Sequence, residues 1–204
     1  MKNLQQVLAD IEKFKQTSAL TKKHNQDGFV YEPLKYNYGF MVFSEEKYTP
    51  SLQKLSDYQY KHRYYCYEKF NNQNDKNVIF VLFNPSSACP TKADPTIKNC
   101  RFLAEKQYGS MEIINVFSER TPKVKEIQTD DNTLNFEFIK LLLNERKDTD
   151  VVIAWGYGKE KEYKEQIAQI KELLNNNDKY EITVNVDILK SGKDLDNAVE
   201  LTKY

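Results

Sequence analysis

The stretch "VIFVLFNPSSACP" is the feature that most constrains what this chain can fold into. Residues 78–83 are six consecutive apolar residues, several of them β-branched, and they follow a polar stretch at 71–77. A short apolar run of this kind is typical of a strand buried on both faces of a parallel sheet. Pro85 ends the strand and leaves Asn84, Ser86 and Ser87 at its carboxyl end. Because ligands bind at that end in open α/β sheets, the sequence predicts a site in this loop.

An alternation of strands and helices continues from residue 77 to residue 190. Further strands are expected at 111–117, 151–155 and 180–189, and helices at 94–108, 133–144 and 163–174. Strands separated by helices of ten or more residues form parallel sheets with right-handed crossovers. We therefore expect an α/β fold with a four-stranded parallel sheet flanked by helices.

The first 70 residues have a different texture. An i, i+3, i+4, i+7 apolar stripe predicts an amphipathic helix at 3–17, and nine of the 14 tyrosines then fall between residues 26 and 70. We expect residues 1–70 to be an N-terminal helix and Tyr-rich segment packed on the core, and 71–204 to be the α/β domain. The tyrosines, together with Lys61, His62 and Arg63, could stack bases and contact phosphates. Alternatively, they cover one side of a small domain with their hydroxyls in water.

Composition narrows the functional classes. Thirty basic and 30 acidic residues give a formal net charge of zero, so a long-range hold on nucleic acid is not evident, although a local basic rim stays open. The sequence shows neither a leader peptide nor an apolar run of about 18 residues, and we expect a soluble, cytoplasmic protein without a membrane partner. Three cysteines match neither a disulfide framework nor a metal cluster, and a Gly-rich phosphate loop is missing. We expect free thiols, no metal and no cofactor.

Two asparagines occupy comparable places at the ends of predicted strands. Asn84 follows the first strand, Asn115 lies within "MEIINVFSER", and Trp155-Gly156 closes "VVIAWG". Parallel strands place these ends along one edge of the sheet, so the two amides could converge there. Burying the amide of Asn115 costs about 1–3 kcal/mol unless its oxygen and nitrogen find partners. A neighbouring loop could satisfy it, or a planar ligand with an adjacent donor and acceptor could.

The motifs themselves carry a resemblance. "FNPSSACPTKADPTIKNC", "INVFSERTPKV" and "IAWG" are similar to a widespread bacterial domain family of unknown function whose motifs run NPSTAD, DPTI, NLF and AWG, over about residues 64–160. The order strand-NPS, strand-N-V, strand-WG also resembles the uracil-DNA glycosylase superfamily. That resemblance implies a hydrolase that flips uracil out of single- or double-stranded DNA and cleaves its N-glycosidic bond.

The resemblance also implies roles for individual residues. Asn84 would place the attacking water, and Asn115 would accept from uracil N3–H and donate to O4. Backbone N–H groups from Pro85 to Ser87 could face O2, the hydroxyls of Ser86 and Ser87 could hold a phosphate, and Phe83 could stack on the base. Phe102 and Tyr67 are alternative stacking partners.

One departure from the superfamily bears on activity. Most active members carry a histidine after the fourth strand, whereas the corresponding stretch here is "VDILKSGKD". Losing one preorganised donor typically costs about 2.7–4 kcal/mol, so weak activity is expected. Ile188 or Leu189 could act as a wedge, with Lys190 and Ser191 on DNA phosphate, or this stretch merely ends a strand.

Other interpretations remain open. Asp94 could be an acid or base, but its place before Pro95 predicts a helix cap. The chain could also be a degenerate member that binds DNA or a protein, including an inhibitor of uracil-DNA glycosylase or a factor encoded on the same mobile element. A third alternative is an enzyme that processes nucleosides or nucleotides, and fold alone does not choose among these.

Overall fold

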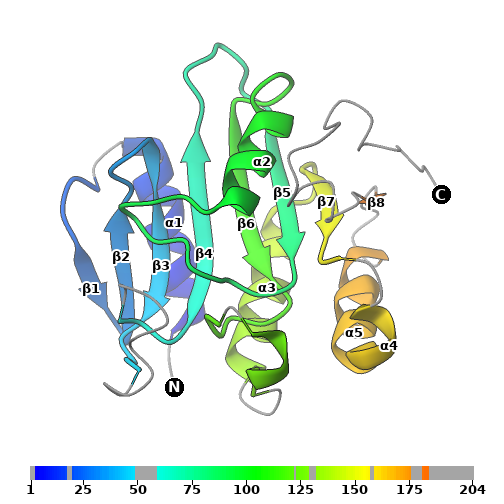
Figure 1. Cartoon of the computed structure of the whole chain (residues 1–204). Helices are drawn as coiled ribbons and strands as arrows, with labels where there is room; N and C mark the ends of the chain where they lie inside the picture. The colour runs from blue at the N-terminus through cyan, green and yellow to red at the C-terminus, as the bar shows by residue number, and fades with distance from the viewer. Residues whose placement is uncertain are drawn as a thin grey trace.

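Residues 3–17, 20–48, 59–121, 123–128, 132–156, 159–175 and 181–183 are described by the computed structural model. Within these residues the body of the protein is one mixed sheet of eight strands in the order β1-β2-β3-β4-β6-β5-β7-β8 (Figure 1). Helices cover both faces of this sheet.

The parallel half of the sheet is built around the "VIFVLF" run. β5 (Asn77–Leu82) lies between β6 (Ser110–Asn115) and β7 (Asp150–Ala154), and all three run in the same direction. β8 (Glu181–Thr183) pairs with β7 in parallel, and the remainder of the strand expected at 180–189 lies outside the described residues. The carboxyl ends of β5, β6 and β7 therefore share one edge.

The other half of the sheet is antiparallel and comes from the N-terminal segment. β1 (His24–Gln26), β2 (Phe29–Pro33), β3 (Tyr38–Ser44) and β4 (Arg63–Lys69) pair in sequence, and β4 joins β6. The expected four-stranded parallel sheet is therefore wrong, because strands of the N-terminal segment extend it. The helix expected at 3–17 is present as α1 (Leu4–Thr17). Strands such as "FVYEP" and "YGFMVFS" are buried on both faces over much of their length, so they lack the polar alternation that marks a strand in a sequence.

The helices divide between the two faces. α1 (Leu4–Thr17), α3 (Thr133–Glu145) and α5 (Lys164–Asn175) pack on one, here the α3 face, and α2 (Pro95–Ala104) packs on the other, the α2 face (Figure 1). β5 serves both, since Ile79 and Val81 point to the α3 face and Phe80 and Leu82 to the α2 face. Two short elements, η2 (Val124–Glu126) and α4 (Lys159–Glu162), complete the described helices, and none of these helices has the length and apolar character needed to cross a membrane.

The Tyr-rich segment is largely core. Five of its tyrosines are buried in the two apolar clusters, namely Tyr31, Tyr60, Tyr64, Tyr65 and Tyr67. They are therefore not an exposed platform for stacking bases, nor do they keep one side in water. The predicted boundary between residues 70 and 71 falls between β4 and β5, which flank β6 in the same sheet.

An irregularity in β4 decides where one charged residue points. Val42 pairs with Tyr65, but the next β3 residue, Phe43, pairs with Arg63, so Tyr64 is an extra residue without a partner in β3. Tyr64 and Tyr65, although adjacent, both join the cluster on the α3 face. Arg63 shares the α2 face with its register partner Phe43. Bulges of this kind re-aim side chains and are over-represented beside functional sites.

Candidate functional site

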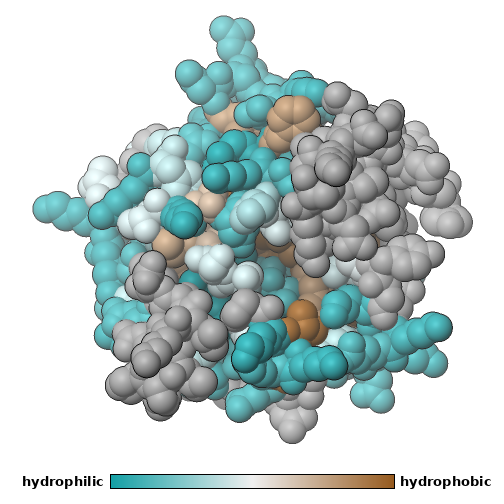
Figure 2. All heavy atoms as spheres, viewed as in Figure 1, coloured by the Kyte–Doolittle hydropathy of each residue, from teal (hydrophilic) through white to brown (hydrophobic). Residues whose placement is uncertain are grey.

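A pocket of about 300 Å³ opens at the carboxyl edge of the parallel strands, on the α2 face. Its lining comes from the ends of β5 and β7, the loop after β5, the start of α2 and the first residue of β4. Figure 2 shows apolar side chains between hydrophilic ones near the middle of this face. The size is at the lower end of the range for small-molecule sites.

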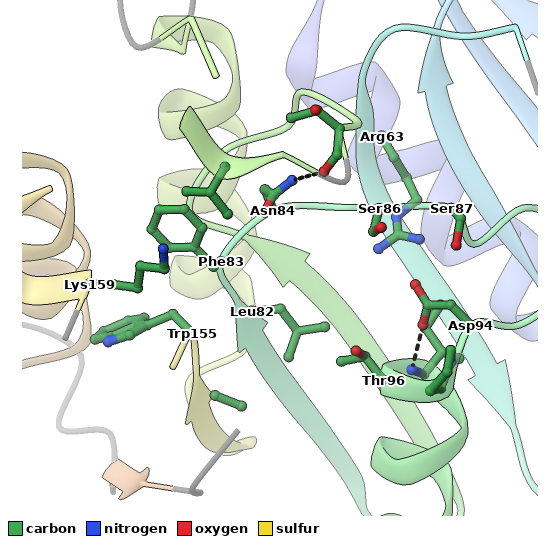
Figure 3. Close-up of a pocket in the computed structure, with 15 residues that line it drawn as sticks. Arg63, Leu82, Phe83, Asn84, Ser86, Ser87, Asp94, Thr96, Trp155 and Lys159 are labelled. Atoms are coloured by element: carbon green, nitrogen blue, oxygen red, sulfur yellow. Dashed lines mark hydrogen bonds between the residues drawn. The ribbon is translucent and has the colours of Figure 1, made fainter. Parts of the chain in front are cut away.

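The pocket has two chemically different ends (Figure 3). Phe83, Trp155 and Lys159 lie at one end, which we call the aromatic end. Arg63, Ser86, Ser87 and Asp94 lie at the other, the polar end. Asn84 and Leu82 lie between them.

Asn84 is held in one orientation. Its Nδ2 donates to the backbone oxygens of Thr121 at 2.7 Å and Pro85 at 3.1 Å. Since both partners are carbonyl acceptors, the nitrogen of the amide must face them and Oδ1 must face the other way. Asn84 therefore offers an acceptor oxygen in the middle of the pocket.

The structure brings several of the predicted residues together. Phe83, Asn84, Ser86 and Ser87 all line the pocket, whereas Pro85 is buried beside it. The Phe83 ring is fixed by edge-to-face contacts with Phe117 and Tyr163, with ring centroids 5.3 and 4.9 Å away. Of the alternative stacking residues, Tyr67 is buried in the sheet and Phe102 is exposed on α2; neither lines the pocket.

Asn115 behaves differently from Asn84. It is 0% exposed and does not line the pocket, but it pairs with Leu82, which does. Alternation along β6 places Asn115 on the α2 face, because Ile113 two residues earlier belongs to that cluster. Neither Oδ1 nor Nδ2 has a hydrogen-bond partner among the described residues. A loop partner for this amide is therefore not found among the described residues, and its contact with a base stays a prediction.

Asp94 and the three cysteines have structural roles in the described fold. Asp94 is the N-cap of α2, accepting from the backbone N–H of Ile97 at 2.9 Å with Pro95 in the first turn, as predicted. The three cysteines are free and buried, also as predicted. No metal-binding cluster of acids, histidines and cysteines occurs within the described part of the chain. Leu189, Lys190 and Ser191 lie outside the described residues.

Two cations in the pocket were not assigned to it from the sequence. Lys159 places Nζ 5.0 Å from the centroid of Phe83, and its place just after the Trp155-Gly156 strand end was a usable signal. From the sequence, Arg63 is expected beside Lys61 and His62 as a phosphate contact of the Tyr-rich segment. Because Tyr64 is present, a regular register would turn Arg63 to the α3 face, and the bulge returns it to the α2 face and the pocket. This irregularity has no recognisable pattern in the sequence.

Residues 63–193 match the family described as Protein of unknown function (DUF1643). The chain belongs to this family. Comparisons with curated proteins and with solved structures gave no match. The predicted membership of a family of unknown function is thus confirmed, and the resemblance to uracil-DNA glycosylases is not shown by these comparisons.

The DUF1643 match and the pocket coincide. The match starts at Arg63, and every residue that lines the pocket falls within it. The strands β1, β2 and β3 and helix α1 precede the match, although they extend the same sheet. The pocket therefore belongs to the DUF1643 part of the chain.

Proposed function

We propose that this protein hydrolyses the N-glycosidic bond of a uracil nucleotide in DNA. The observation that carries the proposal is the orientation of Asn84, whose Nδ2 is bound by two backbone carbonyls while Oδ1 faces the pocket. An oxygen fixed in this way can accept a hydrogen bond from a water and hold it for attack. Preorganisation of this kind is what the reaction needs from a neutral side chain.

The two ends of the pocket suit the two ends of a nucleotide. The base would lie at the aromatic end against Phe83, which puts the glycosidic bond near Asn84 and the sugar-phosphate toward Ser86 and Ser87. In the reaction, the bond between C1′ and the base nitrogen breaks and its electron pair leaves with the base. The water oxygen bonds to C1′ and keeps one proton as a hydroxyl, and the other proton goes to the departed base. Lys159 at the aromatic end would stabilise the negative charge that develops on the base.

Asn115 is the proposed reader of the base edge. Its amide offers an acceptor and a donor side by side, which suits N3–H and O4 of uracil and not the reversed pattern of cytosine. Because the amide is fully buried, the base would reach it only after a local rearrangement next to Leu82. The amide can take such a partner, since neither its oxygen nor its nitrogen has a hydrogen bond among the described residues.

The test uses oligonucleotides that contain one deoxyuridine, single-stranded and double-stranded, followed by alkaline cleavage of abasic sites. We expect slow excision by the wild type and a loss of at least tenfold in Asn84→Ala, the scale of one positioning group. Asn99→Ala is the control, because Asn99 lies on α2 outside the pocket lining. Equal excision by the wild type and Asn84→Ala would refute the assignment of Asn84.

A second candidate is an enzyme that acts on free nucleotides. It is favoured by a net charge of zero combined with a cation, Arg63, inside the pocket. Binding of duplex DNA usually relies on a basic surface. Faster turnover of dUMP or deoxyuridine than of the oligonucleotides, measured by release of free uracil, would favour this candidate.

A further inference from the structure

We propose that Arg63 binds an oxyanion of the ligand, a nucleotide phosphate, at the polar end of the pocket. The inference rests on the proposed function for the identity of the ligand. The reason to expect an anion is the buried guanidinium of Arg63 itself. The proposal adds to the proposed function the group of the substrate that the protein holds in place.

The first argument is the state of the guanidinium. Arg63 is 1% exposed, yet its Nε and Nη1 have no hydrogen-bond partner among the described residues. A guanidinium stays protonated in proteins, so its charge cannot be removed by titration. Burying an unpaired charge is costly, and natural proteins pair such groups with an acid or a ligand.

The other arginines of the chain show what pairing looks like here. Arg101 is bound to Glu68, with Nη2 3.0 Å from Oε2, and Arg146 donates from Nε to Glu112 at 2.9 Å. Arg120 donates to the backbone oxygens of Tyr60 and Ala88 at 3.0 and 3.2 Å. Arg63 differs from these arginines in having two guanidinium nitrogens, Nε and Nη1, without a hydrogen-bond partner among the described residues.

No acidic side chain among the described residues forms an ion pair with Arg63. Burial raises the pKa of the Cys66 thiol to about 12, so Cys66 is neutral at physiological pH. Burial likewise raises the pKa of the Tyr36 phenol well above its ordinary value. Asp94 carries a carboxylate in the same pocket, but it is engaged with the backbone N–H of Ile97 and forms no ion pair with Arg63.

The surroundings suit a phosphate in shape and donors. The hydroxyls of Ser86 and Ser87 flank the guanidinium in Figure 3, and Thr96 lies at the amino end of α2 in the same lining. Guanidinium groups bind phosphate and carboxylate oxygens in pairs, and a helix amino terminus adds a favourable dipole. With a base at the aromatic end, a phosphate on the same nucleotide would fall at this polar end.

Calorimetric titration separates the contribution of the phosphate from that of the base. The titrants are inorganic phosphate, deoxyuridine, dUMP and a single-stranded oligonucleotide with one deoxyuridine. All chains carry Asn84→Ala to slow turnover, and they have arginine, methionine or lysine at position 63. We expect dUMP to bind about 10- to 100-fold more tightly than deoxyuridine when Arg63 is present, the range for hydrogen bonds to a charged group. We expect Arg63→Met to lose that advantage and Arg63→Lys to retain part of it.

The outcomes identify the source of the phosphate. Loss of the dUMP advantage in Arg63→Met assigns Arg63 to a terminal phosphate, and a loss confined to the oligonucleotide assigns it to a backbone phosphodiester. An unchanged preference for both ligands in Arg63→Met would overturn the proposal. Failure of uracil excision with Arg63-dependent phosphate binding intact would count against the proposed function alone.

Folding is controlled with a second variant and a second measurement. Phosphate should raise the melting temperature of the wild type but not of Arg63→Met, because only a ligand of the native state stabilises it. Ser87→Glu, at an exposed position of the lining, places a carboxylate beside the guanidinium and should abolish phosphate binding in a folded chain. Full phosphate binding by Ser87→Glu would contradict the site.

Discussion

Asn115 and Asn135 are buried asparagines 20 residues apart, and we expect their replacement to affect the free energy of unfolding differently. Asn135 donates from Nδ2 to the backbone oxygens of Asn115 and Val116, both at 3.0 Å, whereas the side chain of Asn115 has no partner among the described residues. Replacing Asn115 with leucine, which has a similar shape, removes two unsatisfied polar atoms. We expect Asn115→Leu to leave the free energy of unfolding unchanged or to raise it by about 1 kcal/mol, and to abolish uracil excision. Urea denaturation and the excision assay measure the two effects.

The matched control is Asn135→Leu. It removes two hydrogen bonds to backbone carbonyls, and we expect it to lower the free energy of unfolding by about 1–3 kcal/mol. A comparable loss of stability in Asn115→Leu would mean that the amide of Asn115 is satisfied in the folded protein, which would weaken its assignment as a base reader.

At the scale of elements, α2 is set by its first residues. Asp94 accepts from the N–H of Ile97, and such a cap contributes about 0.5–2 kcal/mol. We expect Asp94→Ala to lose about this amount in thermal denaturation and Asp94→Asn to lose little, since asparagine caps equally well. If Asp94 instead acts as an acid or base in the pocket, Asp94→Asn will fold normally and lose excision activity.

Helix α2 and the loop before it could be predicted from the sequence because their determinants are local. Asp94-Pro95 marks the start of a helix, and the apolar run before Asn84 marks the end of a strand. Each signal involves only a few consecutive residues. β2, β3 and β4 could not be predicted in this way. Their side chains are buried by partners distant in sequence, so a run such as "YYCY" resembles no standard periodicity. Arg63 reached the pocket through a pairing irregularity between β3 and β4, which depends on two strands at once.

β6 carries a buried acid that joins several elements. Glu112 on this strand accepts from Lys15 of α1 at 2.8 Å, from Arg146 after α3 at 2.9 Å and from Tyr65 of β4 at 2.7 Å. Burial opposes its ionisation most strongly, but Lys15 and Arg146 together hold the pKa of Glu112 below its ordinary value.

This lowered pKa predicts an acid-sensitive fold. Because the folded pKa lies below the unfolded value of 4.5, the stabilisation is present above that pH and is lost as the pH falls through the folded pKa. We expect Glu112→Gln to be less stable by about 1.5–3 kcal/mol at pH 7, since Lys15 and Arg146 lose their buried partner and keep only Glu12. We also expect a flatter fall in its stability between about pH 5 and pH 3. Urea titrations over this range measure both slopes, and identical slopes in the two chains would exclude Glu112 as the cause.

At the scale of the whole molecule, the sheet begins before the family match does, because β1, β2 and β3 precede residue 63. The match begins at Arg63, but β4 pairs with β3 along its length, and α1 contributes Lys15 to Glu112. We expect a fragment of residues 63–204 to aggregate, because it would expose the hydrogen-bonding edge of β4 and the apolar α3 face beneath α1. Size-exclusion chromatography and circular dichroism compare it with the full chain. A monomeric fragment with a cooperative unfolding transition would instead support an autonomous domain beginning at β4.

Deleting the extra residue of β4 would affect packing on the α3 face more than the position of Arg63 on the α2 face. Tyr64 occupies the inserted position and packs against Phe29 and Phe138, with ring centroids 5.3 and 6.3 Å away. A homologue that lacks this residue would still pair its arginine with the residue equivalent to Phe43. It would lose the aromatic ring that packs under α3. We therefore expect a deletion here to weaken the fold and to leave the arginine at the pocket.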